Sequence, residues 1–191
     1  MARSDDITAA KRALRRHMRQ AKALMSTAQM RDEAKRVFEL IEQQPWFAQA
    51  QSVMLYYSLP DELPTHDVVR AWSRDKTIYL PRVAGDEIEV VLYREGEFAT
   101  SARYGIEEPL GPALTPSVID LLIVPAIAVD EQCHRLGRGG GFYDRFMARQ
   151  RVGTAIAVAL DCQVVDKVPT LPHDIALQAI ITASHFFTSK H

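Results

Sequence analysis

Apolar side chains recur at helical spacing in the N-terminal part of the chain. Two amphipathic helices are predicted there, over residues 7–25 and residues 26–44, because apolar positions three and four apart share one face of a helix. The second stretch opens on Ser26 and Thr27, residue types that favour helix N-caps, and Pro45 follows its end. The predicted core positions are Leu14, Met18 and Ala21 in the first helix and Val37, Phe38 and Ile41 in the second.

After residue 51 the pattern changes to short apolar runs rich in branched and aromatic residues, which favour strands. Between the first two runs, residues 65–75 have helical spacing with Thr65 as candidate N-cap, and this order predicts a right-handed crossover between parallel strands. Residues 119–130 are apolar almost throughout, as expected of one central strand covered on both faces. The predicted strands are residues 52–58, 76–81, 87–94, 119–130, 155–160 and 179–182.

These elements predict the fold class. We expect an α/β protein, a single three-layer domain over residues 1–191 with an open, mostly parallel sheet and helices on both faces. A length of 191 residues suits one domain with a full core. In sheets of this kind ligands bind at the carboxyl ends of the strands.

Composition narrows the class of protein. The chain is 47% hydrophobic and 25% charged, as is typical of soluble globular proteins, and its formal net charge of −1 argues against a general nucleic-acid or membrane-binding surface. Cys133 and Cys162 lie far apart, which favours reduced thiols over a disulfide framework or a zinc site. The longest apolar run, residues 121–129, falls short of the roughly 20 residues that cross a bilayer. We therefore expect a cytoplasmic monomer that binds neither nucleic acid nor a membrane.

Positive charge is concentrated at the N-terminal end. Residues 1–36 carry ten lysines and arginines against four acidic residues. An arginine-rich helix could be an organelle transit peptide or a nucleic-acid contact, although Asp5 and Asp6 argue against the transit peptide. Composition alone favours a third interpretation, a solvated helix face.

The stretch RLGRGGGFYDRF, residues 135–146, carries the clearest candidate chemistry. Glycines let the backbone adopt positive φ or approach a ligand closely, and successive N–H groups in such a turn form an anion-binding nest. The predicted helix that follows adds a positive dipole end, and Arg135, Arg138 and Arg145 add charges suited to phosphate. The stretch matches neither the P-loop nor the dinucleotide-binding fingerprint. It predicts a phosphate site, with a flexible hairpin tip as the alternative.

Several other side chains near predicted strand or helix ends are candidates. Asp144 and Asp174 could bind Mg²⁺, which prefers oxygen and often joins carboxylates to phosphates, or they could be helix-terminus and loop residues. Glu62 could bind the polar edge of a flat ligand and Tyr57 could stack on it, or they could be plain surface and core residues. No GxSxG motif or activated cysteine is found, so a covalent enzyme intermediate is not indicated.

Ordered motifs along nearly the whole chain resemble the 5-formyltetrahydrofolate cyclo-ligase family, also called 5,10-methenyltetrahydrofolate synthetases. The glycine stretch RLGRGGGFYDR is similar to the family's RLGxGxGYYDR and is the most specific match. The other matches are KRALR (residues 11–15) with Arg19, YYSLPDELPT (residues 56–65), LPR (residues 80–82), YGIEEP (residues 104–109) and DCQVVDKVPTLPHD (residues 161–174).

The resemblance implies a reaction and roles for individual residues. Members of the family use ATP and Mg²⁺ to convert 5-formyltetrahydrofolate, a reduced folate, to 5,10-methenyltetrahydrofolate. It implies catalytic roles for Arg138 and Tyr143 and Mg²⁺ binding by Asp144 and Asp174. For Arg12, Arg16 and Lys22 the interpretation as solvated surface residues is kept. The implied ATP contacts are Lys11, Arg15, Arg135, Leu136, Gly137, Arg138, Gly139, Gly140, Gly141, Phe142 and Tyr143, and the implied folate contacts are Tyr57, Glu62, Arg138, Gly139, Gly140, Gly141 and Phe142.

Two positions depart from the family pattern. Cys133 stands where glycine is usual, so a turn there is expected to be altered, and Phe142 stands where tyrosine is frequent. The change at Cys133 leaves room for a kinase-like enzyme with another acceptor on the same fold. A non-catalytic folate-binding or nucleic-acid-binding module is a third hypothesis.

Overall fold

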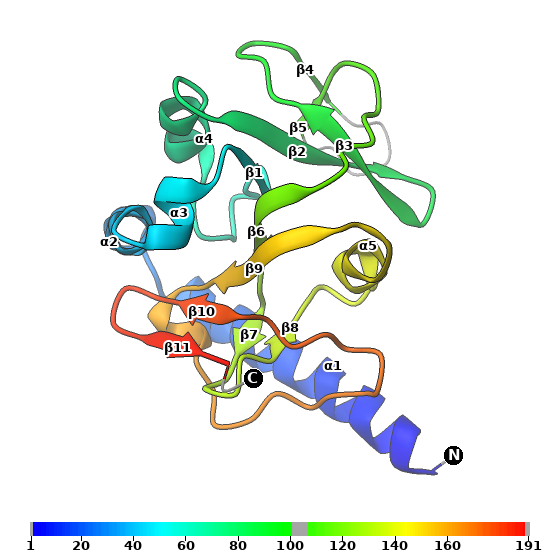
Figure 1. Cartoon of the computed structure of the whole chain (residues 1–191). Helices are drawn as coiled ribbons and strands as arrows, with labels where there is room; N and C mark the ends of the chain where they lie inside the picture. Colours follow the sequence, from blue (N-terminus) through cyan, green and yellow to red (C-terminus); the bar gives the residue numbers. More distant parts are fainter. Residues whose placement is uncertain (1, 101–106, 190–191) are drawn as a thin grey trace.

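The computed structural model describes residues 2–100 and 107–189, and this part of the chain builds a seven-stranded sheet (Figure 1). Neighbouring strands run parallel except at the two edges, where the outermost pairs are antiparallel. The predicted open, mostly parallel sheet is therefore confirmed. In spatial order the strands are β11 (Phe186–Thr188), β10 (Ala179–Ile181), β9 (Val152–Val158), β6 (Ile119–Pro125), β1 (Ser52–Leu55), β2 (Thr77–Ala84) and β3 (Glu87–Leu92).

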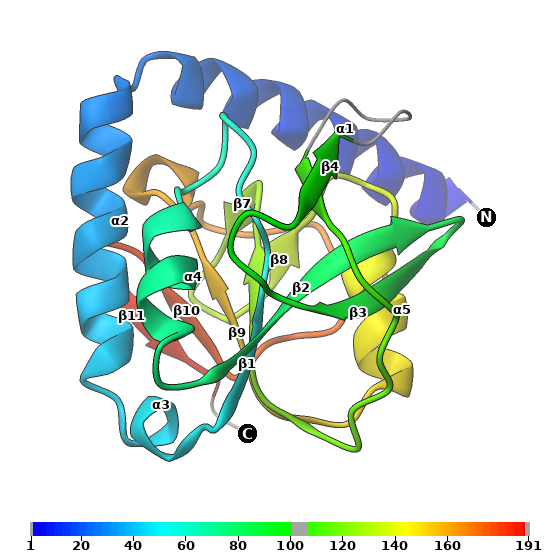
Figure 2. The ribbon, with the colours of Figure 1, turned by 90° about the horizontal axis from the view of Figure 1, so that it is seen from above.

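Helices cover both faces of the sheet (Figures 1 and 2). Helices α2 (Thr27–Glu42), α3 (Pro45–Gln49) and α4 (His66–Trp72) pack on one face, and α5 (Phe142–Arg149) packs on the other. Strand β1 shows why two cores form, because alternate side chains of a strand point to opposite faces. Val53 and Leu55 join the core under α2 and α4, whereas Met54 joins the core under α5. The predicted three layers follow from this alternation.

The long first helix, α1 (Ala2–Ala23), lies across the carboxyl edge of the parallel strands (Figure 2). Its buried Met18 packs with Ile127, Leu136 and Val168 in a small third core cluster. This packing brings the basic N-terminal helix against the segments that follow β6. None of the helices in residues 2–100 and 107–189 is long and apolar enough to cross a membrane.

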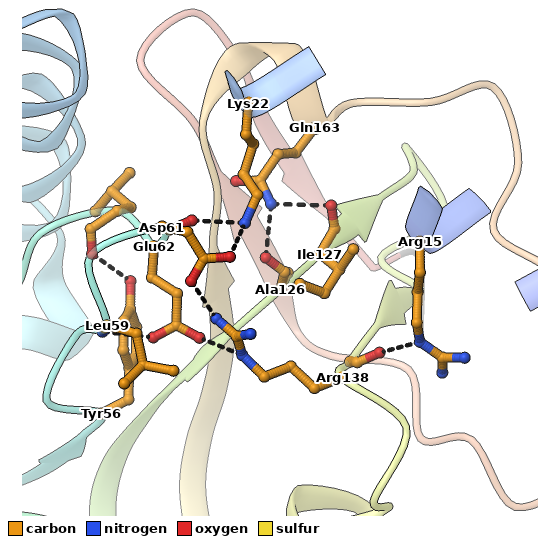
Figure 3. Close-up of polar contacts among 12 residues, drawn as sticks. Arg15, Lys22, Tyr56, Leu59, Asp61, Glu62, Ala126, Ile127, Arg138 and Gln163 are labelled. Atoms are coloured by element: carbon orange, nitrogen blue, oxygen red, sulfur yellow. Dashed lines mark hydrogen bonds and ion pairs between the residues drawn. The ribbon is translucent and has the colours of Figure 1, made fainter. Parts of the chain in front are cut away.

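The predicted single strand over residues 119–130 is wrong, because β6 ends at Pro125. Proline lacks the amide hydrogen that would continue the ladder. The next two carbonyl oxygens, of Ala126 and Ile127, instead accept hydrogen bonds from the Gln163 amide at 2.7 and 2.9 Å (Figure 3). A short hairpin follows, formed by β7 (Ala128–Val129) and β8 (Arg135–Leu136), and it leads directly into the glycine stretch.

Thr65 stands at the N-cap of α4, but its side chain does not cap the helix. Its hydroxyl donates to the carbonyl oxygen of Tyr56 at 2.8 Å and accepts from the amide of Ser58 at 3.0 Å. These bonds take the backbone after Leu55 out of the sheet, so the strand predicted over residues 52–58 is shorter than expected. The elements that the apolar pattern did not predict are α3, β7, β8, β11, the hairpin of β4 (Phe98–Thr100) and β5 (Glu107–Pro109), and a 3-10 helix, η1 (Asp161–Gln163). Of the motif YGIEEP, residues 104–106 lie outside the described residues.

Candidate active site

One cavity of about 380 Å³ lies at the carboxyl edge of the sheet, between α1, the segment after β1 and the glycine stretch. The structure brings all the predicted site residues together on its walls. They are Lys11, Arg15, Tyr57, Glu62, residues 135–144 and Asp174. The lining residues that the sequence did not single out include Thr8, Tyr56, Glu107, Glu108 and His173.

The glycine stretch needs its glycines for the two reasons expected. Gly139 and Gly141 adopt positive φ values of 113° and 68°, which side-chain-bearing residues rarely adopt. Gly140 has no room for a side chain, because a Cβ there would lie 2.4 Å from Cε2 of the Phe142 ring. Gly141 directly precedes α5, so the positive end of this helix lies at the cavity wall.

Two cations of α1 enter the cavity from the opposite side. Lys11 and Arg15 lie one helical turn apart, and Arg15 Nε donates to the carbonyl oxygen of Gly137 at 2.8 Å. Burial lowers the pKa of Arg15, although Asp174 acts in the opposite direction. The interpretation of the basic helix as a wholly solvated face is therefore wrong for these residues, whereas Arg12 and Arg16 are exposed as expected.

The two predicted Mg²⁺ ligands already have cationic partners. Asp144 Oδ2 lies 3.2 Å from Arg135 Nη2, and Asp174 Oδ2 lies 2.5 Å from Lys11 Nζ. Burial acts to raise the pKa of Asp174, but the hydrogen bonds from Lys11 and from the Leu171 amide lower it overall. Within the described residues no group of three or more His, Cys, Asp or Glu side chains forms a metal site. Two carboxylates on one cavity nevertheless fit Mg²⁺, which often uses only one or two carboxylates together with substrate phosphates.

The folate candidates, Tyr57 and Glu62, lie on the wall that follows β1. Glu62 is buried, and its Oε2 accepts from the amide of Leu59 at 3.0 Å (Figure 3). Tyr57 is half-buried and stacks on Phe98 with ring centroids 4.6 Å apart, and His66 meets it edge-on at 3.9 Å. The structure therefore gives one recessed acceptor and one aromatic ring on the same wall.

Arg138 connects the two walls. Its Nε donates to Glu62 Oε1 at 3.0 Å, and its Nη2 donates to Asp61 Oδ1 at 2.5 Å. Asp61 is in turn bound by Lys22, which is buried, so the expectation that Lys22 lies on the solvated face is wrong. Neither Asp61 nor Lys22 was predicted as a site residue. A signal was available, because Lys22 is seven residues from Arg15 and thus lies on the same face of α1.

Two aromatic residues follow the glycines. Burial raises the pKa of the Tyr143 phenol, so the hydroxyl stays protonated, and the Arg135 guanidinium carbon lies 5.6 Å from the centre of its ring. The Phe142 ring lies against Gly140 and is 5.3 Å from the guanidinium carbon of Arg145, which also donates to the Gly140 carbonyl oxygen at 2.8 Å. The ring at position 142 therefore packs the loop without needing a hydroxyl.

Cys133 keeps the glycine-like turn. Its φ of 64° is the only positive value at a non-glycine position in the described residues, and its amide donates to the carbonyl oxygen of Asp130 at 3.1 Å. The side chain is fully buried in the core cluster under α5. The expected alteration of the turn is therefore not seen, and the thiol lies in the core rather than on the cavity wall.

The fold and the cavity define an α/β protein with a glycine-lined pocket that also carries five carboxylates. Its four Lys and Arg side chains and the start of α5 give it a wall suited to phosphate. Residues 7–183 match the model of the 5-formyltetrahydrofolate cyclo-ligase family, and the chain belongs to this family. It is accordingly an enzyme of the ligase class. The hypothesis of a non-catalytic binding module is therefore wrong.

Individual relatives match this chain over most of its length. The 5-formyltetrahydrofolate cyclo-ligase of Escherichia coli (strain K12) is 32% identical, and the match covers 87% of this chain and 97% of that protein. The same-named protein of Haemophilus influenzae is also 32% identical, over 74% of this chain and 79% of its own. The solved structure of Aquifex aeolicus 5,10-methenyltetrahydrofolate synthetase has a TM-score of 0.84 at 27% identity and covers 95% of this chain and 93% of its own, which confirms the fold class.

Proposed function

We propose that the protein uses ATP and Mg²⁺ to convert 5-formyltetrahydrofolate to 5,10-methenyltetrahydrofolate, with release of ADP and phosphate. The observation that carries this proposal is the contact of Arg138 with Glu62 across one cavity, with an Nε to Oε1 distance of 3.0 Å. It joins a wall suited to phosphate to a wall suited to the ring of a folate. Family membership supports the folate conversion itself.

The ATP half of the proposal uses the cationic wall. Residues 135–143 would wrap the phosphates, since their glycines bring backbone amides close and α5 begins there. Lys11, Arg15 and Arg135 would add charge from two sides, because they line the same cavity.

Asp144 and Asp174 would hold Mg²⁺, since both carboxylates line the cavity. When bound, Mg²⁺ would neutralise charge that develops on the phosphate oxygens. In the protein alone, Arg135 and Lys11 balance these carboxylates, so both cations become available to phosphate oxygens once the carboxylates take other partners.

The folate half uses the wall after β1. The recessed carboxylate of Glu62 would accept hydrogen bonds from the N–H groups of the pterin ring, and low local polarity strengthens such bonds. The ring of Tyr57 offers an apolar face against which a flat heterocycle would pack.

The chemistry needs no protein nucleophile. In the proposed reaction the formyl oxygen of the folate attacks the γ-phosphate of ATP, giving an iminium phosphate and ADP. The 10-nitrogen of the folate then attacks the formyl carbon and gives up its proton, the ring closes, and phosphate leaves with the former formyl oxygen. Arg138 would stabilise charge on the transferred group, and the protonated Tyr143 hydroxyl would donate a hydrogen bond beside it.

An assay of the purified protein with 5-formyltetrahydrofolate, ATP and Mg²⁺ tests the proposal. The near-ultraviolet absorbance of the methenyl product should rise only when all three are present, with one ADP formed per product. Folded protein that gives no such signal would contradict the proposed function.

The alternative of a kinase-like enzyme with another acceptor rests on Cys133, which lies in the core. Phosphate transfer to another small molecule, with none of the methenyl product from 5-formyltetrahydrofolate, would favour that alternative. The monomeric state, the cytoplasmic location and the lack of nucleic-acid or membrane partners stay predictions.

A further inference from the structure

We propose that Asp61, anchored by Lys22, is a positioning residue that keeps Arg138 in the cavity wall when a folate occupies Glu62. The inference rests on the proposed function, because that function assigns Glu62 to the pterin ring. Asp61 does not itself line the cavity in the described residues, so it would act through Arg138.

Arg138 has two carboxylate partners (Figure 3). Its Nη2 lies 2.5 Å from Asp61 Oδ1 and its Nε lies 3.0 Å from Glu62 Oε1. The side chain is 48% exposed and comes from a glycine-rich segment, so these two ion pairs fix where the guanidinium lies. Its position therefore depends on which of the two carboxylates is available.

Glu62 has both oxygens engaged in the protein alone. Oε2 accepts from the Leu59 amide and Oε1 accepts from Arg138, and the side chain is only 8% exposed. Donor groups of a pterin that approach Oε1 meet the guanidinium already bound there. We infer that folate binding turns Arg138 away from Glu62 and frees its Nε.

Asp61 supplies the partner that Arg138 retains in that event. With Asp61 present, folate binding at Glu62 leaves the Arg138 guanidinium with one carboxylate partner instead of two. With Asp61 neutralised, folate binding leaves the guanidinium with no carboxylate partner, which costs more, because charge-assisted hydrogen bonds are about twice as strong as neutral ones. Asp61 therefore lowers the cost of opening Glu62 to the folate, and it keeps Arg138 close to the phosphate wall.

Lys22 is what makes Asp61 a fixed partner. The Asp61 side chain is 52% exposed, and an isolated surface carboxylate would move freely. Lys22 Nζ, with a side chain only 5% exposed, donates to Asp61 Oδ2 at 2.8 Å and to the Asp61 carbonyl oxygen at 2.5 Å. These two bonds hold the backbone and the carboxylate together, so that Oδ1 faces Arg138. The end of α1 is thereby connected to the glycine stretch.

Calorimetric binding of 5-formyltetrahydrofolate in the absence of ATP tests this role. The Asp61→Asn variant should bind the folate about tenfold more weakly, since it loses one charge-assisted partner, while its affinity for ATP changes less than about twofold. The Asp67→Asn variant, which neutralises an almost fully exposed aspartate, is the matched control and should bind both as the wild type does. An unchanged folate affinity in Asp61→Asn would overturn the proposal.

The same substitution in an Arg138→Ala background separates positioning from a purely structural role. If Asp61 acts through Arg138, Asp61→Asn should then change folate affinity less than about twofold. A full tenfold loss in that background would overturn the proposal. Should the buried Lys22 ammonium unfold the Asp61→Asn protein, the Lys22→Met/Asp61→Asn variant removes that charge, and the same tenfold loss is expected. Failure of the wild type to bind the folate would contradict the proposed function instead.

Discussion

Arg135 and Asp144 form an ion pair at the base of the glycine stretch, with Nη2 3.2 Å from Oδ2. The Arg135 side chain is only 4% exposed, and its Nε has no hydrogen-bond partner among the described residues. The pair therefore balances a nearly buried charge and leaves the buried Nε donor unused. It also joins a residue predicted to contact ATP with a residue predicted to bind Mg²⁺, so both can exchange partners when those ligands enter.

Replacing Asp144 by asparagine tests the metal role. The Asp144→Asn amide can still accept from Arg135 but carries no charge for Mg²⁺, so kcat should fall by about 100-fold or more and the Mg²⁺ concentration for half-maximal rate should rise. Initial rates across a Mg²⁺ titration measure both quantities. The exposed Asp166 gives the matched control, Asp166→Asn, which should behave as the wild type. An unchanged Mg²⁺ dependence in Asp144→Asn would remove Asp144 from the metal site.

Gly139 combines positive φ with close contact to Arg15. A Cβ at this position would lie 3.3 Å from the guanidinium carbon of Arg15, whereas a Cβ at Gly96, which also has positive φ, would meet nothing within 4 Å. Gly96→Ala should lower the free energy of unfolding by about 1 kcal/mol through backbone strain, and Gly139→Ala should lower it more, because its φ of 113° lies farther outside the left-handed region. Only Gly139→Ala should also displace Arg15 and raise the KM for ATP, by about tenfold if one charged contact is lost.

Urea unfolding and steady-state kinetics on these two glycine variants separate strain from contact. An equal rise in KM for both would mean that strain alone disturbs the cavity. An unchanged KM for both would mean that Arg15 does not contact ATP.

The layers of the fold could be predicted from the sequence because they depend on local periodicity. The consecutive apolar residues Val53, Met54 and Leu55 and the apolar run of β6 suffice to predict strands covered on both faces by helices. Pro125 is a local signal for the end of β6, because proline lacks the amide hydrogen of the ladder. The path of the next two residues could not be predicted, because their carbonyl oxygens bind the Gln163 amide more than thirty residues away in the chain. Periodicity carries no information on such a long-range contact.

The candidate site also has parts that local sequence predicts and parts that depend on long-range contacts. Glycines and arginines that are close together in the sequence suffice to predict the phosphate wall, since their chemistry is local. The spacing of Lys22 from Arg15 indicates that both lie on one face of α1. The burial of Lys22 could not be predicted, because it depends on Asp61, which is 39 residues away. A lysine in a basic helix is solvated by default. Only the folded structure shows the Asp61 carboxylate that compensates the charge of the buried Lys22 ammonium.

His66 makes stability depend on pH near neutrality. Burial lowers the pKa of His66 below its ordinary value, and the Glu107 and Asp67 carboxylates only partly oppose this shift. Below about pH 6.5, the ordinary pKa of histidine, the unfolded chain binds a proton that the folded protein does not bind. The free energy of unfolding is therefore highest above that pH, where His66 is neutral in both states. It decreases as the pH falls from about 6.5 towards the lowered pKa of the folded protein.

Substituting His66 by asparagine should flatten this dependence. The His66→Asn side chain keeps a group able to bond the Ser58 hydroxyl, which lies 3.0 Å from His66 Nδ1, but does not titrate. Urea unfolding at several values between about pH 5 and pH 8 should give a smaller slope for the variant than for the wild type. The matched control is His17→Asn, at an exposed position. Identical slopes for His66→Asn and the wild type would show that His66 does not titrate differently on folding.

Cys133 is expected to store backbone strain at a φ of 64°. Cys133→Ala should lose the packing of the buried sulfur but keep the strain, whereas Cys133→Gly loses the sulfur and the buried Cβ but relieves the larger cost, the backbone strain. The glycine variant should therefore unfold with a free energy about 1 kcal/mol higher than the alanine variant. Cys133→Val should be the least stable of the three by about 2 kcal/mol or more, because a branched side chain tolerates positive φ worst.

Because the thiol lies in the core under α5, Cys133→Gly should leave KM for ATP and for the folate unchanged. Equal stabilities of the alanine and glycine variants would mean that the turn relaxes to negative φ, and altered KM values would mean that the turn at Cys133 controls the cavity after all.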